Sequence, residues 1–492
     1  MSDTPQAEGK CPVTGARAAP AGTVASRGAD PADGNPEMLP PSVKLLAKRE
    51  GLLSLARRSR RNILEVIPEV SLTRRIISGR LLRRFHIVTD PEANRAIFKT
   101  RIENYPKSPE AKGILQKALR HGLFVLDGDE WRWQRRALNP AFAPRNIKRL
   151  GALMSRVAEE GALRLQSKDR AVNISDEMMR TAFDVIVRVT FAGGNGQSAV
   201  PVDVVNDAIE HYLDNTGRVS ILDYLGLPTW IPRPGRVRTH PTLKALKAGA
   251  DAAIADRRKH PNLEDPALMD LLLDAEDPET GRKMTDEELR DNLITFLIAG
   301  HETTALTLTW ALYLLAQAPE KQERASQEAR LVLGARTATV DDLSQLGYIR
   351  QVLQEAMRLY PPIPMHLRTA QGTDTLCEHA VKKGDTVIVP YYTLHRHRSH
   401  WQDPDRFMPE RFDDMSKIDR FAYVPFSVGP RVCIGAEFAM QESIIILATL
   451  LARFRFSPIA GKQPIPKLIL TLRPNEDIWL NVEAIATEAA EA

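Results

Sequence analysis

A single cysteine near the C-terminus has the surroundings expected of a metal-binding thiolate. Cys433 lies in the stretch Phe426-Ser-Val-Gly-Pro-Arg-Val-Cys-Ile-Gly435, whose glycines let the backbone turn tightly around a sulfur. A helix is expected to begin near Ala436, and a helix N-terminus should lower the pKa of a nearby thiol. Arg431 could reach an anionic group on a bound cofactor. A cysteine simply buried at a turn would not need this combination, so the pattern predicts that Cys433 binds haem iron.

A second reactive group interrupts an apolar stretch in the middle of the chain. In Ala299-Gly-His-Glu-Thr-Thr304, the glycine costs a helix about 1 kcal/mol relative to alanine. Glu302 could relay protons, and Thr303 could orient them while bonding a carbonyl of its own helix. His301 is interpreted as a lining residue. The alternative is a helix whose polar residues simply face a cavity or solvent, and these residues alone leave both possibilities open.

Two charged patterns are less specific. Glu355 and Arg358 stand at i and i+3 on one helix face, an arrangement that contributes only about 0–1 kcal/mol on a surface. Trp131 and Arg135 stand at i and i+4, which is also typical of a surface cation–π pair. Neither pattern predicts a function by itself.

Taken together, these motifs resemble those of the cytochrome P450 family, in the family's order, from about residue 41 to the C-terminus. The cysteine loop matches the family's haem-binding signature at every fixed position. The resemblance implies that Cys433 is the axial iron ligand of haem b. It also implies that Glu302 and Thr303 form the acid–alcohol pair that supplies protons during oxygen activation.

The same resemblance assigns further residues by position. It implies a propionate-binding set, a structural charge network and a substrate pocket. The propionate set is Trp131, Arg135, Arg368, His395 and Arg431; the network is Glu355, Arg358 and Arg411; the tentative pocket is Phe296, Ala299, Ile363, Met365 and Leu470.

The implied activity is insertion of one atom of O2 into an apolar organic substrate, such as a fatty acid, terpenoid or steroid. Electrons from NAD(P)H are expected to arrive through a separate ferredoxin or flavodoxin with its reductase, because no fused reductase is expected. Acidic partners could be steered by Arg132 and Arg136. The alternatives are a peroxygenase that uses hydrogen peroxide, whose known members tend to lack the acid–alcohol pair, and a non-catalytic haem sensor or redox carrier, which should have an output domain.

Helical periodicity dominates the chain, so we expect a mainly α fold with a small β region, a long central helix over the haem and a C-terminal ligand loop. Thr285 and Glu288 form a capping box that should begin the central helix. We predict helices over 285–317, 341–359 and 436–454, and strands over 84–89 and 376–390. Residues 1–40 have the composition of a disordered tail, which leaves 41–492 as a single haem domain.

Composition excludes several other classes. The chain has 492 residues, 43% hydrophobic content and a net charge of only +5, and it has no nucleic-acid-binding motif. Its three cysteines argue against a disulfide framework and favour a cytoplasmic protein. No uninterrupted apolar run reaches membrane-spanning length. The basic stretch 41–64 is typical of a solvated helix, with peripheral membrane contact as the minority interpretation. A monomer is expected.

Overall fold

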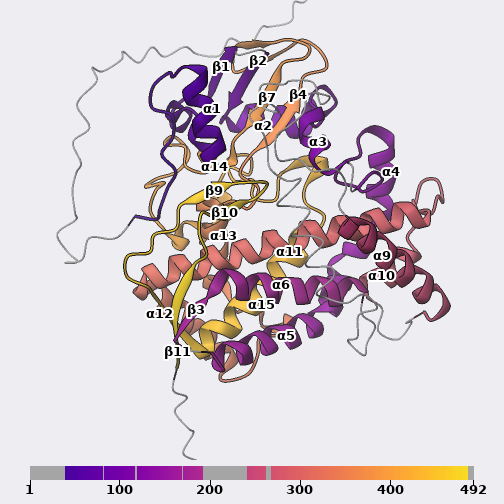
Figure 1. Ribbon diagram of the computed structural model, residues 1–492, viewed down its shortest axis with the longest axis vertical. Coiled ribbons are helices and arrows are strands. Elements are labelled where there is room, and N and C mark those ends of the chain that lie inside the picture. The colour runs from indigo at the N-terminus through magenta and orange to yellow at the C-terminus, as the bar shows by residue number, and fades with distance from the viewer. Residues whose placement is uncertain are drawn as a thin grey trace, which may run out of the picture. The chain divides into compact units, whose positions relative to one another are not determined.

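Helices predominate among the described residues, which also form four small sheets (Figure 1). The computed structural model describes residues 39–80, 83–116, 119–168, 170–191, 241–261 and 267–485. Residues from Leu39 onward group as one compact unit, whereas most of the expected tail lies outside the described residues. This mainly α architecture with a small β region confirms the predicted fold class.

The helices are α1 (Leu52–Arg61), α2 (Pro91–Arg95), α3 (Pro109–Leu115), α4 (Gly128–Leu138), α5 (Pro144–Gln166), α6 (Ile174–Phe191), α9 (Pro241–Lys259), α10 (Leu268–Leu273), α11 (Asp286–Gln317), α12 (Pro319–Leu333), α13 (Gly347–Leu359), α14 (Tyr391–Leu394) and α15 (Ala436–Arg453). The strands are β1 (Ile76–Arg80), β2 (Arg84–Val88), β3 (Ala171–Asn173), β4 (His366–Thr369), β5 (Asp374–Leu376), β6 (His379–Val381), β7 (Thr386–Val389), β8 (Phe454–Pro458), β9 (Pro466–Leu468), β10 (Leu472–Pro474) and β11 (Trp479–Ala484).

The central helix α11 begins where the sequence predicts. Thr285 is its N-cap, and its backbone N–H donates to Glu288 Oε2 at 2.9 Å while Glu288 N donates back to Thr285 Oγ1 at 3.3 Å. Local capping explains the start of the helix but not its persistence over 32 residues. That persistence comes from burial, because α11 packs against α6, α9, α13 and α15.

The largest sheet has the strand order β1-β2-β7-β4. β2 and β7 pair in parallel, with His86 opposite Val387, and the outer pairs are antiparallel. Val387 and Val389 on β7 are fully buried, as expected for an inner strand. This sheet matters for function because β4 carries Arg368. The separate β9–β10 hairpin carries Arg473 close to α11.

One element boundary differs from the predictions. The helix expected from residue 341 begins only at Gly347, because Val340–Asp342 form a 3₁₀ turn closed by a capping box between Thr339 and Asp342. The strands expected over 376–390 are present as β6 and β7, and the turn between them contains Gly384, with φ +86°. Among the described residues, no helix is both long enough and apolar enough to cross a bilayer.

Candidate active site

The cysteine loop is held by its own backbone and by one glycine. Cys433 N donates to the Phe426 carbonyl at 2.9 Å, which closes the turn just before α15. Gly429 has φ +78°, and a Cβ at that position would lie 2.1 Å from the Phe98 carbonyl oxygen. Only glycine therefore allows the loop to approach this segment.

The Cys433 thiol does not have the predicted lowered pKa. Burial raises its pKa, and the opposing effects of the Gly435 backbone N–H and Arg135 are smaller. The residue nevertheless has exposed surface. A thiolate at this position therefore needs a further positive partner, such as a metal ion.

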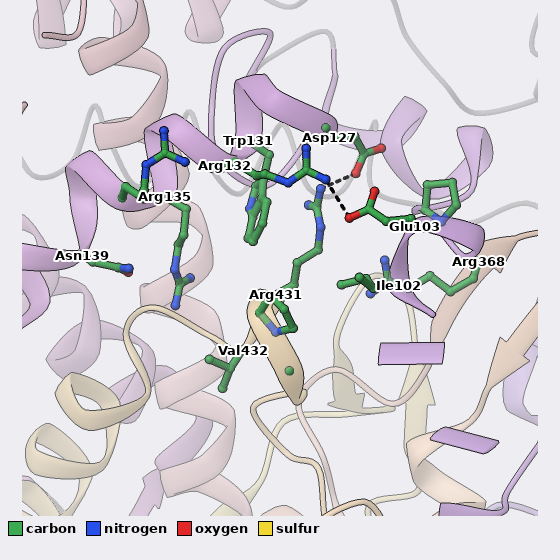
Figure 2. Close-up of a pocket in the computed structure, with 15 residues that line it drawn as sticks. Ile102, Glu103, Asp127, Trp131, Arg132, Arg135, Asn139, Arg368, Arg431 and Val432 are labelled. Atoms are coloured by element: carbon green, nitrogen blue, oxygen red, sulfur yellow. Dashed lines mark hydrogen bonds and ion pairs between the residues drawn. The ribbon is translucent and has the colours of Figure 1, made fainter. Parts of the chain in front are cut away.

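A recess of about 440 Å³ lies beside this loop and contains four of the five predicted propionate-binding residues (Figure 2). Trp131 and Arg135 reach it from α4, Arg368 from β4, and Arg431 from the turn before Cys433. These positions are far apart in sequence, so the fold has brought one aromatic and three cationic side chains to a single cavity.

Arg368 is the most informative residue of the recess. It is 1% exposed, and none of its three guanidinium nitrogens has a hydrogen-bond partner in the part of the chain that the structure describes. Burial lowers its pKa to about 10. A buried cation without a partner is costly, so this site fits an anionic group that accepts hydrogen bonds from Arg368.

Arg431 and Arg135 are placed differently. Arg431 donates to Asp127 Oδ1 at 2.5 Å and stacks 4.2 Å above the Trp131 ring. Burial lowers the pKa of Arg135, and its proximity to Cys433 opposes that change. Arg135 lines the recess and also interacts electrostatically with the thiol, so one anionic cofactor could contact both.

Sequence reasoning missed two members of this region. Burial, and then Arg431 and Arg368, hold the pKa of Lys107 well below its usual value. His366 has its pKa lowered well below the usual value by burial and then by Arg368 and Lys107. Lys107 forms an isolated backbone bridge with Arg368, a contact between distant segments that no local motif reveals. Arg431 thus lowers the pKa of both Lys107 and Arg368, and a bound anion would oppose this effect.

His395 is not brought to the recess. It is fully buried, its Nε2 accepts a hydrogen bond from Val424 N at 3.0 Å, and its carbonyl accepts one from Arg358 at 2.8 Å. Burial, followed by Arg358 and Arg396, lowers its pKa to about 3. His395 does not line the recess, but its Nδ1 has no hydrogen-bond partner among the described residues, so its propionate contact stays a prediction.

On α11, one stripe is open in an otherwise buried helix. Between Asp291 and Ala316 every residue is buried except Ala299, Gly300 and Thr303. Thr303 Oγ1 donates to the Ala299 carbonyl at 2.7 Å, the bond expected from the sequence. The open stripe therefore places a hydroxyl and a small side chain toward free space.

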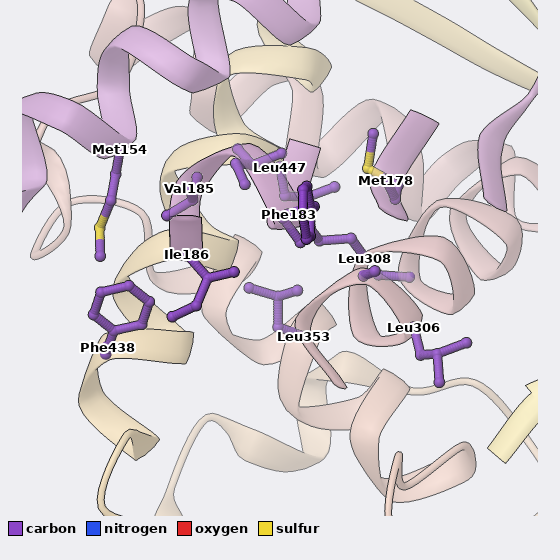
Figure 3. Close-up of a cluster of buried hydrophobic side chains, with 14 of the residues drawn as sticks. Met154, Met178, Phe183, Val185, Ile186, Leu306, Leu308, Leu353, Phe438 and Leu447 are labelled. Carbon is purple, nitrogen blue, oxygen red and sulfur yellow. The ribbon is translucent and has the colours of Figure 1, made fainter. Parts of the chain in front are cut away.

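Gly300 has a packing role. A Cβ there would lie 3.1 Å from Ile186 Cδ1, so glycine lets α6 lie close to α11. Figure 3 shows Phe183 and Ile186 of α6 near leucines of α11 in this cluster. His301 lies against the same helix, with its ring edge-on to Phe183 at 5.1 Å, and burial lowers its pKa to about 4.

Glu302 and Thr303 do not contact each other. Glu302 is 2% exposed, accepts a hydrogen bond from Thr471 Oγ1 at 2.6 Å, and forms an ion pair with Arg473. Both partners belong to the C-terminal hairpin region. The carboxylate is thus held apart from the hydroxyl, which the sequence pattern could not show.

The charge network is present. Arg358 binds Glu355 through two hydrogen bonds of 2.6 and 2.8 Å, and Arg411 Nε donates to the same carboxylate at 3.1 Å. Arg358 also donates to three backbone carbonyls, those of His395, Pro404 and Arg406. The network ties α13 to the segment that precedes the cysteine loop.

The tentative pocket residues lie outside the recess of Figure 2. Phe296 is buried against Phe142 at a centroid distance of 5.0 Å, and Met365 is 8% exposed. Ala299 is exposed, while Ile363 and Leu470 are half-buried. None of the five lines the recess beside the cysteine loop.

Comparison with known proteins agrees with this geometry. The family model for cytochrome P450 matches residues 79–481. The chain is 30% identical to Protein LUTEIN DEFICIENT 5 of Arabidopsis thaliana over 81% of this chain and 70% of that protein. It is 31% identical to cyclooctat-9-en-7-ol 5-monooxygenase of Streptomyces melanosporofaciens over 77% and 81%. It is 32% identical to a bifunctional cytochrome P450/NADPH–P450 reductase of Bacillus subtilis over 75% and 35%.

The fold, the recess and the relatives together define an oxygen-activating haem protein. The chain belongs to the cytochrome P450 family and is a haem-thiolate monooxygenase. It uses O2 and electrons from a redox partner, as the family does. This result favours the monooxygenase over the peroxygenase and sensor alternatives.

Proposed function

We propose that this chain hydroxylates an apolar organic substrate with a haem b bound between the cysteine loop and the open stripe of α11. Bound haem would supply oxygen activation, which a thiolate ligand favours by increasing the electron density at iron. The single observation that carries the proposal is the buried, unpartnered Arg368 in a cationic recess beside Cys433. Such a recess fits a cofactor that has carboxylates near its metal.

Cys433 would be the iron ligand, and Trp131, Arg135, Arg368 and Arg431 would hold the propionates. Lys107 is a neighbour of this set, because its backbone bridges to Arg368, but its Nζ already donates to the Phe124 carbonyl. Arg431 is already paired with Asp127, so it would position the Trp131 ring as well as contribute charge. Arg368 would make the strongest contact, because it loses no existing hydrogen bond on binding.

Protons would reach the open stripe through Thr303 and Glu302. Thr303 Oγ1 is the exposed hydroxyl, and Glu302 is a buried carboxylate one residue away. Thr471 and Arg473 both bind the Glu302 carboxylate. To transfer protons, Glu302 must therefore exchange one of these two contacts for a water molecule. Thr471 and Arg473 are therefore positioning residues in this proposal.

The network of Glu355, Arg358 and Arg411 would keep the segment before the cysteine loop in place. We assign the substrate to the space bordered by Phe296, Ala299, Ile363, Met365 and Leu470, whose apolar character suits a fatty acid, terpenoid or steroid. Within residues 41–492 we infer one haem domain that acts as a monomer in the cytoplasm.

Electrons from NAD(P)H would arrive through a separate ferredoxin or flavodoxin. The steering role expected of Arg132 and Arg136 has little support. Arg132 is paired with Glu103 and Asp129, and Arg136 with Asp277 and Glu279, so nearby carboxylates offset both charges. A long-range field from these two arginines is correspondingly weak.

Replacing Cys433 tests the proposal. Cys433→Ser should remove the thiolate band from the difference spectrum of the reduced, CO-bound protein and abolish substrate oxidation. Cys377→Ser is the matched control, because Cys377 is the other cysteine in the described part of the chain and burial raises its pKa to about 11. An unchanged thiolate band in Cys433→Ser would overturn the assignment.

A further inference from the structure

A strongly basic surface lies at the start of the described chain. We call residues 44–61 the N-terminal basic surface. They contain seven cationic side chains and one carboxylate, Glu50, for a formal charge of +6. The whole chain has a net charge of +5, so the remainder carries −1. All of the protein's excess positive charge therefore lies in this segment.

The cations of this surface form two sets. Arg58 is paired with Glu50 and Glu65, and Arg61 with Glu65, and these pairs attach α1 to the turn that follows it. The other five are exposed and have no ion pair in the described part of the chain. They are Lys44, Lys48, Arg49, Arg57 and Arg60. The second set contributes no visible stabilising contact to the fold.

Apolar side chains are exposed in the same place. Leu53 is 90% exposed, and it shares one helical stripe with Arg57 and Arg60 at i, i+4 and i+7. Of the ten exposed large apolar side chains among the described residues, Leu39 and Val70 also come from this part of the chain. Leu39 precedes, and Val70 follows, segments joined by a backbone bridge between Leu46 and Pro68.

We propose that the N-terminal basic surface binds an anionic phospholipid bilayer. Cations at the headgroup phosphates and a leucine at the edge of the acyl region are the two features of interfacial helices. An acidic protein partner would account for the arginines but would give the exposed Leu53 no function. Binding of this kind is reversible and weakens as salt screens the charges.

Vesicle sedimentation of the full-length, haem-loaded protein tests the proposal without any measurement of turnover. The protein should sediment with vesicles of phosphatidylcholine mixed with phosphatidylglycerol, but not with phosphatidylcholine alone, and high salt should release it. Arg57→Glu combined with Arg60→Glu should weaken binding by roughly tenfold or more, as expected when several headgroup charge contacts are lost. Leu53→Ser should weaken it severalfold and leave the salt dependence intact.

The matched control reverses Arg145 and Arg149, which are exposed on α5 without an ion pair among the described residues. Figure 1 places α5 at the opposite end of the compact unit from α1. This control should bind vesicles like the unmodified protein, and all variants should keep the same melting temperature. Three outcomes would overturn the proposal: an equal loss of vesicle binding in the control, equal binding of the unmodified protein to neutral vesicles, or unchanged binding of the Arg57/Arg60 variant.

Discussion

Among the described residues, Arg358 and Arg368 are the two arginines that are less than 2% exposed, and their surroundings are opposite. Arg358 is 0% exposed and donates to one carboxylate and three backbone carbonyls. Arg368 is 1% exposed and has no hydrogen-bond partner among the described residues. The first charge is neutralised by the protein itself. The second has no such partner among the described residues, so the difference contrasts a structural cation with the cation that we propose binds the cofactor.

Removing Arg358, the buried cation that has partners, should have the largest effect on stability. Arg358→Ala leaves the buried Glu355 with Arg411 as its remaining cationic partner and should destabilise the fold by about 3–5 kcal/mol. The variant should have a lower melting temperature and should purify without haem. Arg350→Ala, on the same helix, is the control and should behave like the unmodified protein. A stable, haem-loaded Arg358→Ala protein would contradict the structural role assigned to Arg358.

Removing Arg368, the cation without a partner, should have the opposite effect on the stability of the haem-free protein. Arg368→Met removes an unpaired buried charge, so the melting temperature of the haem-free protein should stay the same or rise. Haem binding should weaken by about 1.5–3 kcal/mol, the contribution of a charged hydrogen bond. Titration of the haem-free protein with haem measures this, and Arg368→Lys should be intermediate. If the stability of the haem-free protein and its affinity for haem both fell by the same amount, Arg368 would be a structural residue and not a haem-binding one.

Unlike Arg368, a buried histidine can release its proton and so avoid the cost of a buried charge without a partner. His301 has its pKa lowered to about 4 by burial, against an unfolded value of 6.5. Its contribution to stability is therefore complete above pH 6.5 and is lost as the pH falls toward 4. His301→Phe should reduce the slope of stability against pH in that window by up to about 1.4 kcal/mol per pH unit. The free energy of unfolding of both proteins should be measured across this pH range. An unchanged slope against pH in His301→Phe would contradict this prediction.

The smallest effect on stability is expected on the open stripe. Thr303→Ala removes a hydroxyl that bonds only its own helix, so stability should change by less than about 1 kcal/mol. Product formed per O2 consumed should nevertheless fall severalfold, with release of hydrogen peroxide. Thr307→Ala, which removes a similar bond one turn further on, is the control. Full coupling in Thr303→Ala would exclude the hydroxyl from proton delivery.

Features that depend on near neighbours in sequence could be predicted. The capping box of Thr285 and Glu288, the Glu355–Arg358 pair and the bond from Thr303 to Ala299 all join residues within one or two turns of a helix. The predicted propionate-binding residues on α4 and β4 required the family resemblance, because they meet only in the folded chain. The fold class followed from helical periodicity.

What the sequence could not show depends on distant contacts and burial. Arg473 reaches Glu302 from a hairpin near the C-terminus, and Lys107 meets Arg368 across an isolated bridge. The thiol pKa was predicted with the wrong sign, because the helix end and Arg135 were weighed without the burial that outweighs them. The sequence also could not show that the Nε2 of His395 accepts a hydrogen bond from the Val424 backbone.

The absent side chain of Gly429 also limits how this enzyme can change. Since the loop backbone sits directly on the Phe98 carbonyl, position 429 fixes the spacing between the cysteine loop and the segment Ala96–Thr100. Any side chain there would act as a wedge that moves the sulfur together with the loop. Substitutions elsewhere in the loop can alter the polarity around Cys433 at constant geometry, whereas substitution at this position alters the geometry first. Mutant libraries that aim to tune the iron while keeping its position should therefore leave this residue unchanged.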